Sequence, residues 1–285
     1  YKKNNLPNKI LLSGEKGIGK STLAYHLINF VLSENEECSY DCENNKINSE
    51  NKSYKLIQNR SNPNFNLIDV EDEKKYIDIN QIRKLIINLN KSSFNLKKRF
   101  VLIDNIELLN LNSINALLKI LEEPNENINF ILINNNKRVL PTLKSRCLNF
   151  KVFLTNNQSI KIVNQLLKDD MYNIINNELL DNYVTPGKFF KLIKLSEEYN
   201  VDLVNFNLNT TLKKIIGDKI YKKDRSIIEI IYSFIELYFR NNISINNISL
   251  LRSYHYFLQK INNTKIYNLD EESLFLEFED KILNE

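Results

Sequence analysis

Apolar residues in the first 155 positions follow two patterns that alternate along the chain. Short, nearly continuous apolar runs predict β-strands, and these lie at residues 10–12, 65–70, 100–104, 129–134 and 148–153. Between them, apolar residues recur every three or four positions, which predicts helices that begin near residues 20, 78, 113 and 141. Strands that alternate with helices predict an α/β fold built on a parallel sheet.

Only the helical pattern is found after residue 156. It predicts helices at residues 159–169, 188–198, 212–220, 226–239, 248–261 and 271–283. The tripeptide Thr185-Pro186-Gly187 predicts a break before the second of them. Stripes of Ile, Leu, Tyr and Phe on these helices indicate a packed core rather than a cofactor site. The polar, Asn-rich segment 33–60 predicts a long surface insertion with mobile parts.

Composition adds few constraints. The 285 residues are 42% hydrophobic and 26% charged, as in globular proteins, and a net charge of +4 is too small to predict nucleic-acid binding by itself. No apolar stretch is long enough to cross a bilayer and no signal peptide is visible, so we expect a cytoplasmic protein without membrane contact. Because the chain starts at Tyr1 and not at Met, we expect it to be truncated or processed, and a targeting segment before Tyr1 stays open.

The cysteines and histidines predict no metal site. Three cysteines without a secretory signal indicate a reducing compartment. Cys38 and Cys42 are spaced C-x-x-x-C with no second pair nearby, which favours free thiols in a polar loop over zinc. The two histidines, His26 and His255, are far apart in the sequence, which argues against His-based catalysis.

The first predicted strand and helix are joined by a sequence that matches G-x-x-x-x-G-K-[ST], the phosphate loop. Glycines let backbone N–H groups approach a phosphate, and the following helix directs its positive end toward it. We expect Lys20 to reach the β- and γ-phosphates and Ser21 to hold Mg²⁺. A solvent turn with an incidental lysine is disfavoured because three of only five glycines lie in this motif. The expected nucleotide-binding residues here are Gly14, Glu15, Lys16, Gly17, Ile18, Gly19, Lys20, Ser21 and Thr22.

A second element of such a site is Asp104, which ends the apolar run 100–104. An acid at the end of a buried strand beside a phosphate loop holds Mg²⁺, the Walker B role. The alternative is that Asp104 merely ends a strand or starts a turn. The phosphate loop favours the magnesium role for Asp104 together with Ser21.

Four motifs lie within residues 104–150: Asn115-Ala116-Leu117-Leu118-Lys119, Leu121-Glu122-Glu123-Pro124, Phe130-Ile131-Leu132, and Leu140-Pro141-Thr142 followed by Ser145-Arg146-Cys147. Through these motifs, residues 104–150 resemble the core of bacterial clamp-loader AAA+ proteins. Upstream, Asn62-Pro63-Asn64-Phe65 and Ile79-Asn80-Gln81-Ile82-Arg83 are more similar to the delta-prime subunit of DNA polymerase III than to gamma/tau. The gamma/tau pattern also has a zinc-binding cysteine set near Cys38 and Cys42, which this chain lacks. The resemblance is strong over about the first 150 residues and mostly architectural afterwards.

The resemblance implies three domains: an AAA+ ATPase core at 1–154, a small helical lid at 155–200 and a helical collar at 201–285. It further implies a five-membered ring with gamma/tau and delta that opens the sliding clamp and places it on primer–template DNA. The alternatives are a gamma/tau-type clamp-loader ATPase, or a self-sufficient P-loop ATPase or nucleotide-dependent transferase outside the replisome. The Ser-Arg-Cys motif and the helical second half favour the ring subunit.

Three further site residues follow from the resemblance. Asn134 or Asn135 matches the sensor-1 position that detects the γ-phosphate of ATP. Lys188 lies where sensor 2 is expected, although a lysine lacks the bidentate fork of the usual arginine, and a solvated lysine at a helix start is the alternative. Arg146 matches the arginine finger, which acts in trans on a neighbour's ATP; its alternative is a structural ion pair near the sheet edge.

One position departs from the family pattern. Active members have a glutamate directly after the Walker B aspartate, where this chain has Asn105. An amide positions a water molecule but does not accept its proton. Glu107 is two residues farther on, and we expect it to point elsewhere. We therefore expect ATP and Mg²⁺ binding with only weak hydrolysis by this subunit alone.

Overall fold

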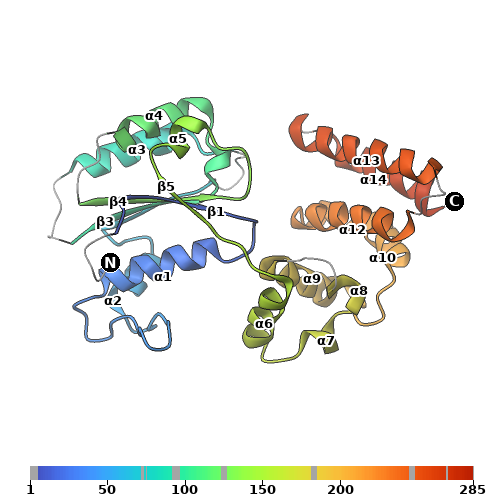
Figure 1. Cartoon of the computed structure of the whole chain (residues 1–285), viewed down its shortest axis with the longest axis horizontal. Helices are drawn as coiled ribbons and strands as arrows, with labels where there is room; N and C mark the ends of the chain where they lie inside the picture. Colours follow the sequence, from blue (N-terminus) through green and yellow to red (C-terminus); the bar gives the residue numbers. More distant parts are fainter. Residues whose placement is uncertain are drawn as a thin grey trace. The chain divides into compact units, whose positions relative to one another are not determined.

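The computed structural model describes residues 6–71, 74, 76–91, 97–122, 127–180, 185–243, 248–267 and 269–284. The chain divides into two compact units, Tyr1–Leu154 and Thr155–Glu285 (Figure 1). None of the helices in the described ranges combines the length and apolarity that crossing a membrane requires.

The first unit is built on a five-stranded sheet in which every pairing is parallel. Its strands are β1 (Lys9–Ser13), β2 (Phe65–Ile68), β3 (Arg99–Ile103), β4 (Ile128–Asn134) and β5 (Leu148–Lys151), in the order β2-β3-β4-β1-β5. All residues of β3 and β4 are buried, as expected for inner strands covered on both faces. The predicted α/β class with a parallel sheet is confirmed.

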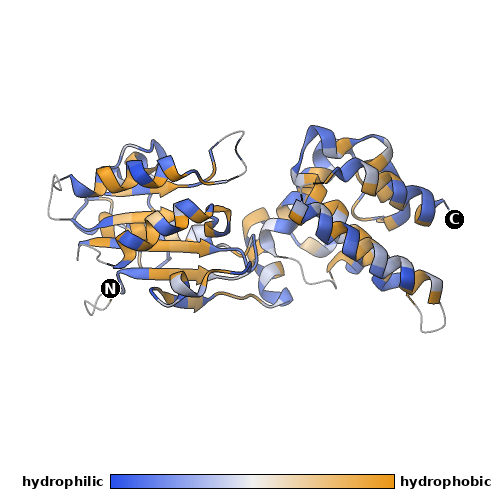
Figure 2. Ribbon diagram, turned by 90° about the horizontal axis from the view of Figure 1, so that it is seen from above, coloured by the Kyte–Doolittle hydropathy of each residue, from blue (hydrophilic) through white to orange (hydrophobic). Residues whose placement is uncertain are grey.

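Helices cover both faces of this sheet (Figure 1). One face packs on α1 (Lys20–Leu32) and α2 (Lys52–Gln58), and the other on α3 (Ile79–Asn90) and α4 (Leu111–Glu122). Alternate strand residues pack against the two helix layers, so the centres of the inner strands are apolar on both faces (Figure 2). The helix α3 begins directly after Asp78, as predicted, and Asp78 forms a capping box with Gln81. The predicted short turn at 141–146 is α5 (Pro141–Lys144), followed by β5. The residues Glu123 and Pro124 after α4 lie outside the described residues.

Segment 33–60 lies mostly at the surface, as expected, but parts of it pack on α1. The hydroxyl of Tyr40 lies 2.9 Å from Nδ1 of His26, and the Tyr40 ring meets the Phe30 ring edge-on. The carboxylate of Glu36 accepts hydrogen bonds from the backbone N–H and the hydroxyl of Ser53 at the start of α2. The sequence pattern missed α2 because the helix is short and its partners are distant in the sequence.

The second unit consists of helices in the part that the structure describes, as predicted. They are α6 (Asn156–Leu167), α7 (Met171–Ile174), α8 (Asn177–Leu180), α9 (Pro186–Tyr199), α10 (Leu208–Gly217), α11 (Ile220–Lys223), α12 (Ser226–Asn242), α13 (Ile248–Tyr267), α14 (Glu271–Phe278) and a π-helical turn, η2 (Glu279–Leu283). One buried hydrophobic cluster contains residues on both sides of position 200. The separation of a lid from a collar at that position stays a prediction.

Several helix boundaries differ from those expected, and two of the differences have a clear cause in the backbone. The helix α9 already begins at Pro186, because proline suits the first helical position and Thr185 is the N-cap; the helix therefore starts within this tripeptide and not after it. The predicted helix at 212–220 is interrupted at Lys219, whose φ of 50° is left-handed, so α10 and α11 are separate.

Candidate nucleotide-binding site

The loop between β1 and α1 has a backbone that depends on glycine. Gly17 and Gly19 have φ values of 88° and 90°, in the left-handed region that other residues rarely adopt. The N–H of Gly14 donates to the carbonyl of Asn134 at 3.2 Å. A Cβ on Gly14 would overlap the carbonyl oxygen of Val152 and lie 2.6 Å from Cδ1 of Ile18. The loop is therefore closely packed on its inner side by the main chain of the neighbouring strands.

Lys20 is the first residue of α1 and only 4% of its surface is exposed. Its Nζ donates to the carbonyl oxygens of Gly14 at 2.9 Å and Glu15 at 2.6 Å. Burial lowers the pKa of the ammonium, an effect partly opposed by the charges of Asp104, Glu107 and Glu15. A buried cation that is held by neutral carbonyls gains from an anionic ligand, so this residue fits a phosphate group.

Ser21 and Asp104 come together at the end of β3, although they are 83 positions apart. The Ser21 hydroxyl donates a short hydrogen bond to Oδ2 of Asp104. Burial raises the pKa of the Asp104 carboxyl, while the hydrogen bond from Ser21 acts in the opposite direction. Within the described ranges, no cluster of three His, Cys, Asp or Glu residues forms a metal cage. A hydroxyl and one carboxylate fit Mg²⁺, which is bound through few protein oxygens and keeps phosphate and water ligands.

A chain of hydrogen bonds links the ends of β2, β3 and β4 beside this pair. Asn105, with a left-handed φ of 61°, donates from Nδ2 to Oδ1 of Asp69 at 3.2 Å. Nδ2 of Asn135 donates to Oδ1 of Asn105 at 2.5 Å and to Oε1 of Glu107 at 2.9 Å. The expectation that Glu107 points elsewhere is therefore wrong. The acid after β2, Asp69, was missed in the sequence, where a single acid after a strand is a weak signal.

Of the two sensor-1 candidates, only Asn135 joins this chain. Asn134 lies at the end of β4, and its Nδ2 donates to the carbonyl of Lys137 at 3.0 Å. Its buried Oδ1 has no hydrogen-bond partner in the described part of the chain. The other loop positions divide by exposure: Ile18 is buried, whereas Lys16 and Thr22 are exposed.

Arg146 follows α5 and is engaged within its own chain. Its Nη2 lies 2.6 Å from Oε1 of Glu122 on α4, and its Nη1 donates to the carbonyl of Thr142 at 2.8 Å. The Arg146 side chain remains 32% exposed. In the isolated chain Arg146 thus forms an ion pair, which is the alternative to the arginine-finger role. Its action on a neighbouring subunit stays a prediction. The next residue, Cys147, is buried, which raises the pKa of its thiol to about 11.

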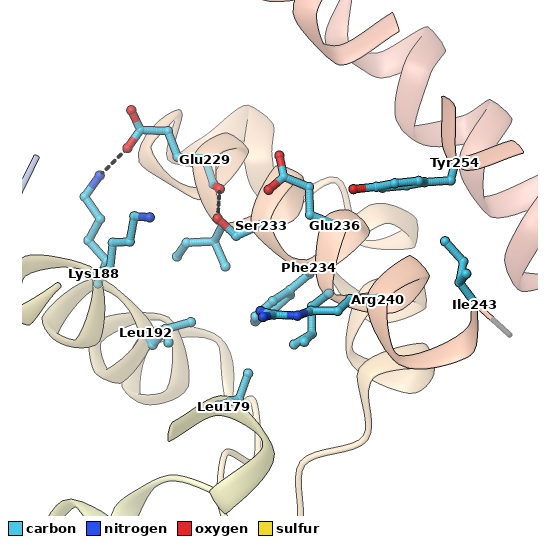
Figure 3. A pocket seen from close by; sticks show the side chains of 13 residues that line it. Leu179, Lys188, Leu192, Glu229, Ser233, Phe234, Glu236, Arg240, Ile243 and Tyr254 are labelled. Carbon is cyan, nitrogen blue, oxygen red and sulfur yellow. Dashed lines mark hydrogen bonds and ion pairs between the residues drawn. The ribbon is translucent and has the colours of Figure 1, made fainter. Parts of the chain in front are cut away.

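Lys188 belongs to the second unit, in the first turn of α9. It lines a cavity of about 530 Å³ between α9, α12 and α13, with Leu192, Phe234 and Leu237 among the apolar lining residues (Figure 3). The neighbouring Lys191 pairs with Glu229 across this cavity at 3.0 Å. The sensor-2 role of Lys188 is a prediction that this geometry does not test.

The family described as DNA polymerase III, delta subunit, matches residues 1–155, more than half of the 285-residue chain. The chain belongs to this family. The residues that match this family span the whole first unit, and they include the phosphate loop, Asp104 and Arg146.

Individual relatives carry related names. The DNA polymerase III subunit delta' of Pseudomonas aeruginosa is 33% identical over 138 residues, which are 48% of this chain and 40% of that protein. The DNA polymerase III subunit gamma of Buchnera aphidicola subsp. Schizaphis graminum is 29% identical over 209 residues, 72% of this chain and 55% of the relative. The chain spans about half the length of these two relatives. The subunit delta' of the same Buchnera is 24% identical over 279 residues, 92% of this chain and 81% of that protein.

Proposed function

We propose that this chain is an ATP-binding, delta-prime-like subunit of a DNA polymerase III clamp loader. In this role it joins gamma/tau and delta in a five-membered cytoplasmic ring that loads the sliding clamp onto primer–template DNA. The observation that carries the proposal is a complete phosphate loop, with buried Lys20 and the Ser21–Asp104 pair, in a chain of the delta-subunit family. The names of the delta' and gamma relatives support the same assignment.

The residues of the first unit have distinct roles in nucleotide binding. The loop amides and the N-terminus of α1 bind phosphate oxygens, and Lys20 leaves its two carbonyl partners to contact them. Ser21 and Asp104 hold Mg²⁺, which neutralises phosphate charge when bound. Asn105 orients water but accepts no proton, so hydrolysis at this site is slow. By the resemblance, Lys188 in the first turn of α9 takes the sensor-2 position.

Arg146 serves the nucleotide of the adjacent gamma/tau subunit. A guanidinium is always charged and bridges two phosphate oxygens, which suits an arginine finger. To act in trans, Arg146 exchanges its partly exposed ion pair with Glu122 for a phosphate of the neighbour. Exposed ion pairs contribute at most about 1 kcal/mol, so this exchange costs little. The helical second unit supplies the lid and the collar through which the ring assembles.

The proposal is tested by purifying tagged gamma/tau and delta from the native cell and identifying this chain among the bound proteins. In parallel, Lys20→Ala removes the main cation of the site and is expected to weaken ATP binding, measured by calorimetry, by at least about tenfold. Unchanged ATP affinity in this variant contradicts the nucleotide site. Absence of the chain from the purified assembly contradicts the clamp-loader role.

A further inference from the structure

The carboxylate of Glu107 accepts two hydrogen bonds from Asn135, beside the candidate nucleotide-binding site. Both carboxylate oxygens contact this one residue: Oε1 accepts from Nδ2 at 2.9 Å, and Oε2 accepts from the backbone N–H at 3.4 Å. The second hydrogen of Nδ2 is given to Oδ1 of Asn105 at 2.5 Å. An Asn amide has two N–H donors, so both are used inside the protein.

The resemblance assigns Asn135 the sensor-1 role of donor to the γ-phosphate, and this arrangement conflicts with that role. A phosphate oxygen accepts hydrogen bonds, so Asn135 contacts it only by giving up Glu107 or Asn105. The charge of Glu107 is also felt at Lys20, where it raises the ammonium pKa and is second only to Asp104 among the carboxylates. A carboxylate at this place therefore opposes an additional phosphate group in two ways, by occupying the donor and by repelling the charge.

We propose that Glu107 biases the nucleotide site against a γ-phosphate by holding Asn135, so that the isolated chain discriminates against ATP relative to ADP. The inference rests on the proposed nucleotide site and adds a selectivity-determining residue to it. ADP lacks the group that competes for Asn135, so its binding is nearly independent of Glu107. ATP binds tightly only when Asn135 is released.

The test is a comparison of Mg²⁺-ADP with the non-hydrolysable analogue Mg²⁺-AMPPNP, titrated calorimetrically into the full chain. Glu107→Gln keeps the size of the side chain but removes its charge. A hydrogen bond to a charged group contributes roughly 1.5–3 kcal/mol, so we expect AMPPNP affinity to rise about tenfold while ADP affinity stays within about twofold. Glu71→Gln is the matched control, because it removes an exposed carboxylate of the first unit that pairs with Lys74 rather than with Asn135. It should change the AMPPNP-to-ADP ratio by less than about threefold.

A double-mutant cycle separates the specific contact from a general charge effect. In an Asn135→Ala background, Glu107→Gln should change the AMPPNP-to-ADP ratio by less than about threefold, since the hydrogen bond is gone and only the weaker charge repulsion remains. Equal effects on both nucleotides, or an undiminished effect in that background, overturn the inference while leaving the nucleotide site intact. Failure of the unmodified chain to bind either nucleotide overturns the proposed site as well. Unchanged circular dichroism and melting of each variant confirm that the fold is retained.

Discussion

Gly14→Ala is the substitution that most directly tests the packing of the phosphate loop. The new Cβ would overlap the carbonyl oxygen of Val152 and lie 2.6 Å from Cδ1 of Ile18. The Ile18 side chain is free to rotate away only at the cost of its burial. The carbonyl of Val152 is less adaptable, because the N–H of Val152 is bonded to the carbonyl of Ser13 at 2.8 Å. Gly14 itself is tied to Asn134 at 3.2 Å.

The expected cost follows from these contacts. Overpacking costs about 1–3 kcal/mol, and loss of one of the two backbone hydrogen bonds adds roughly 1 kcal/mol. We therefore expect Gly14→Ala to lower the free energy of unfolding of the first unit by about 2–4 kcal/mol. For a unit of this size that corresponds to a fall in Tm of roughly 5–15 °C. ATP affinity should fall at least about tenfold, because the loop amides move.

Gly217→Ala is the matched control for this experiment. Gly217 ends α10, no heavy atom lies within 4 Å of the position of its Cβ, and its φ is not in the left-handed region. Alanine there should leave Tm unchanged or raise it slightly, since it gains at most about 1 kcal/mol of helix propensity. Calorimetry and thermal melting of both variants make the comparison. A Gly14→Ala chain that melts and binds ATP like the Gly217→Ala chain refutes the packing argument.

Three further predictions concern catalysis, assembly and pH. Asn105→Glu places a carboxylate directly after Asp104. Because a general base contributes on the order of a hundredfold or more, the single-turnover rate of ATP hydrolysis should rise by that factor. A wild-type chain that already hydrolyses ATP at about one per second or faster contradicts this prediction. Arg146→Ala should leave this chain's own ATP binding nearly unchanged. It should lower hydrolysis at the adjacent gamma/tau site on the order of a thousandfold, which reduces the DNA-stimulated ATPase of a reconstituted ring by the share of that site, and Arg146→Lys should rescue little. A mutant ring that assembles and retains wild-type ATPase rules out the finger. Hydrogen bonds from Lys260 and Lys281 hold the pKa of Glu277 at about 2, below its ordinary 4.5. The stabilisation is present above about pH 4.5 and lost as pH falls toward 2, so Glu277→Gln should lower the free energy of unfolding by on the order of 1 kcal/mol at pH 7 and by nothing near pH 2. An equal difference at both pH values in urea titrations contradicts this assignment.

The strands and the phosphate loop could be predicted from sequence because their signals are local. Every residue of β3 and β4 is buried, so each strand appears as an apolar run. The loop is recognisable because its glycines and Lys20 occupy fixed spacings within eight residues. The capping box of α3 is equally local, with Asp78 and Gln81 three positions apart. Features of this kind need no knowledge of the tertiary structure.

The parts that could not be predicted depend on contacts between distant residues. Glu107 and Asn135 are 28 positions apart, and only the parallel pairing of β3 and β4 brings their ends together. The position of Glu107 was mispredicted because the 3₁₀ turn η1 (Ile106–Leu108) after Asn105 redirects the chain. Helix α2 was missed for the same reason, since Ser53 meets Glu36 across 17 residues of irregular chain.

The different environments of the three thiols make the chain selectively reactive toward labelling reagents. A maleimide attacks the thiolate, and a pKa of about 11 leaves only about one in a thousand Cys147 thiols ionised at pH 8. Burial also keeps the reagent away from Cys147, whereas Cys42 is exposed and Cys38 is partly so. A fluorescent dye can therefore be attached to Cys38 or Cys42 in segment 33–60, while Cys147 beside Arg146 is kept unchanged. The unaltered sequence thus offers a position from which binding to other proteins can be followed.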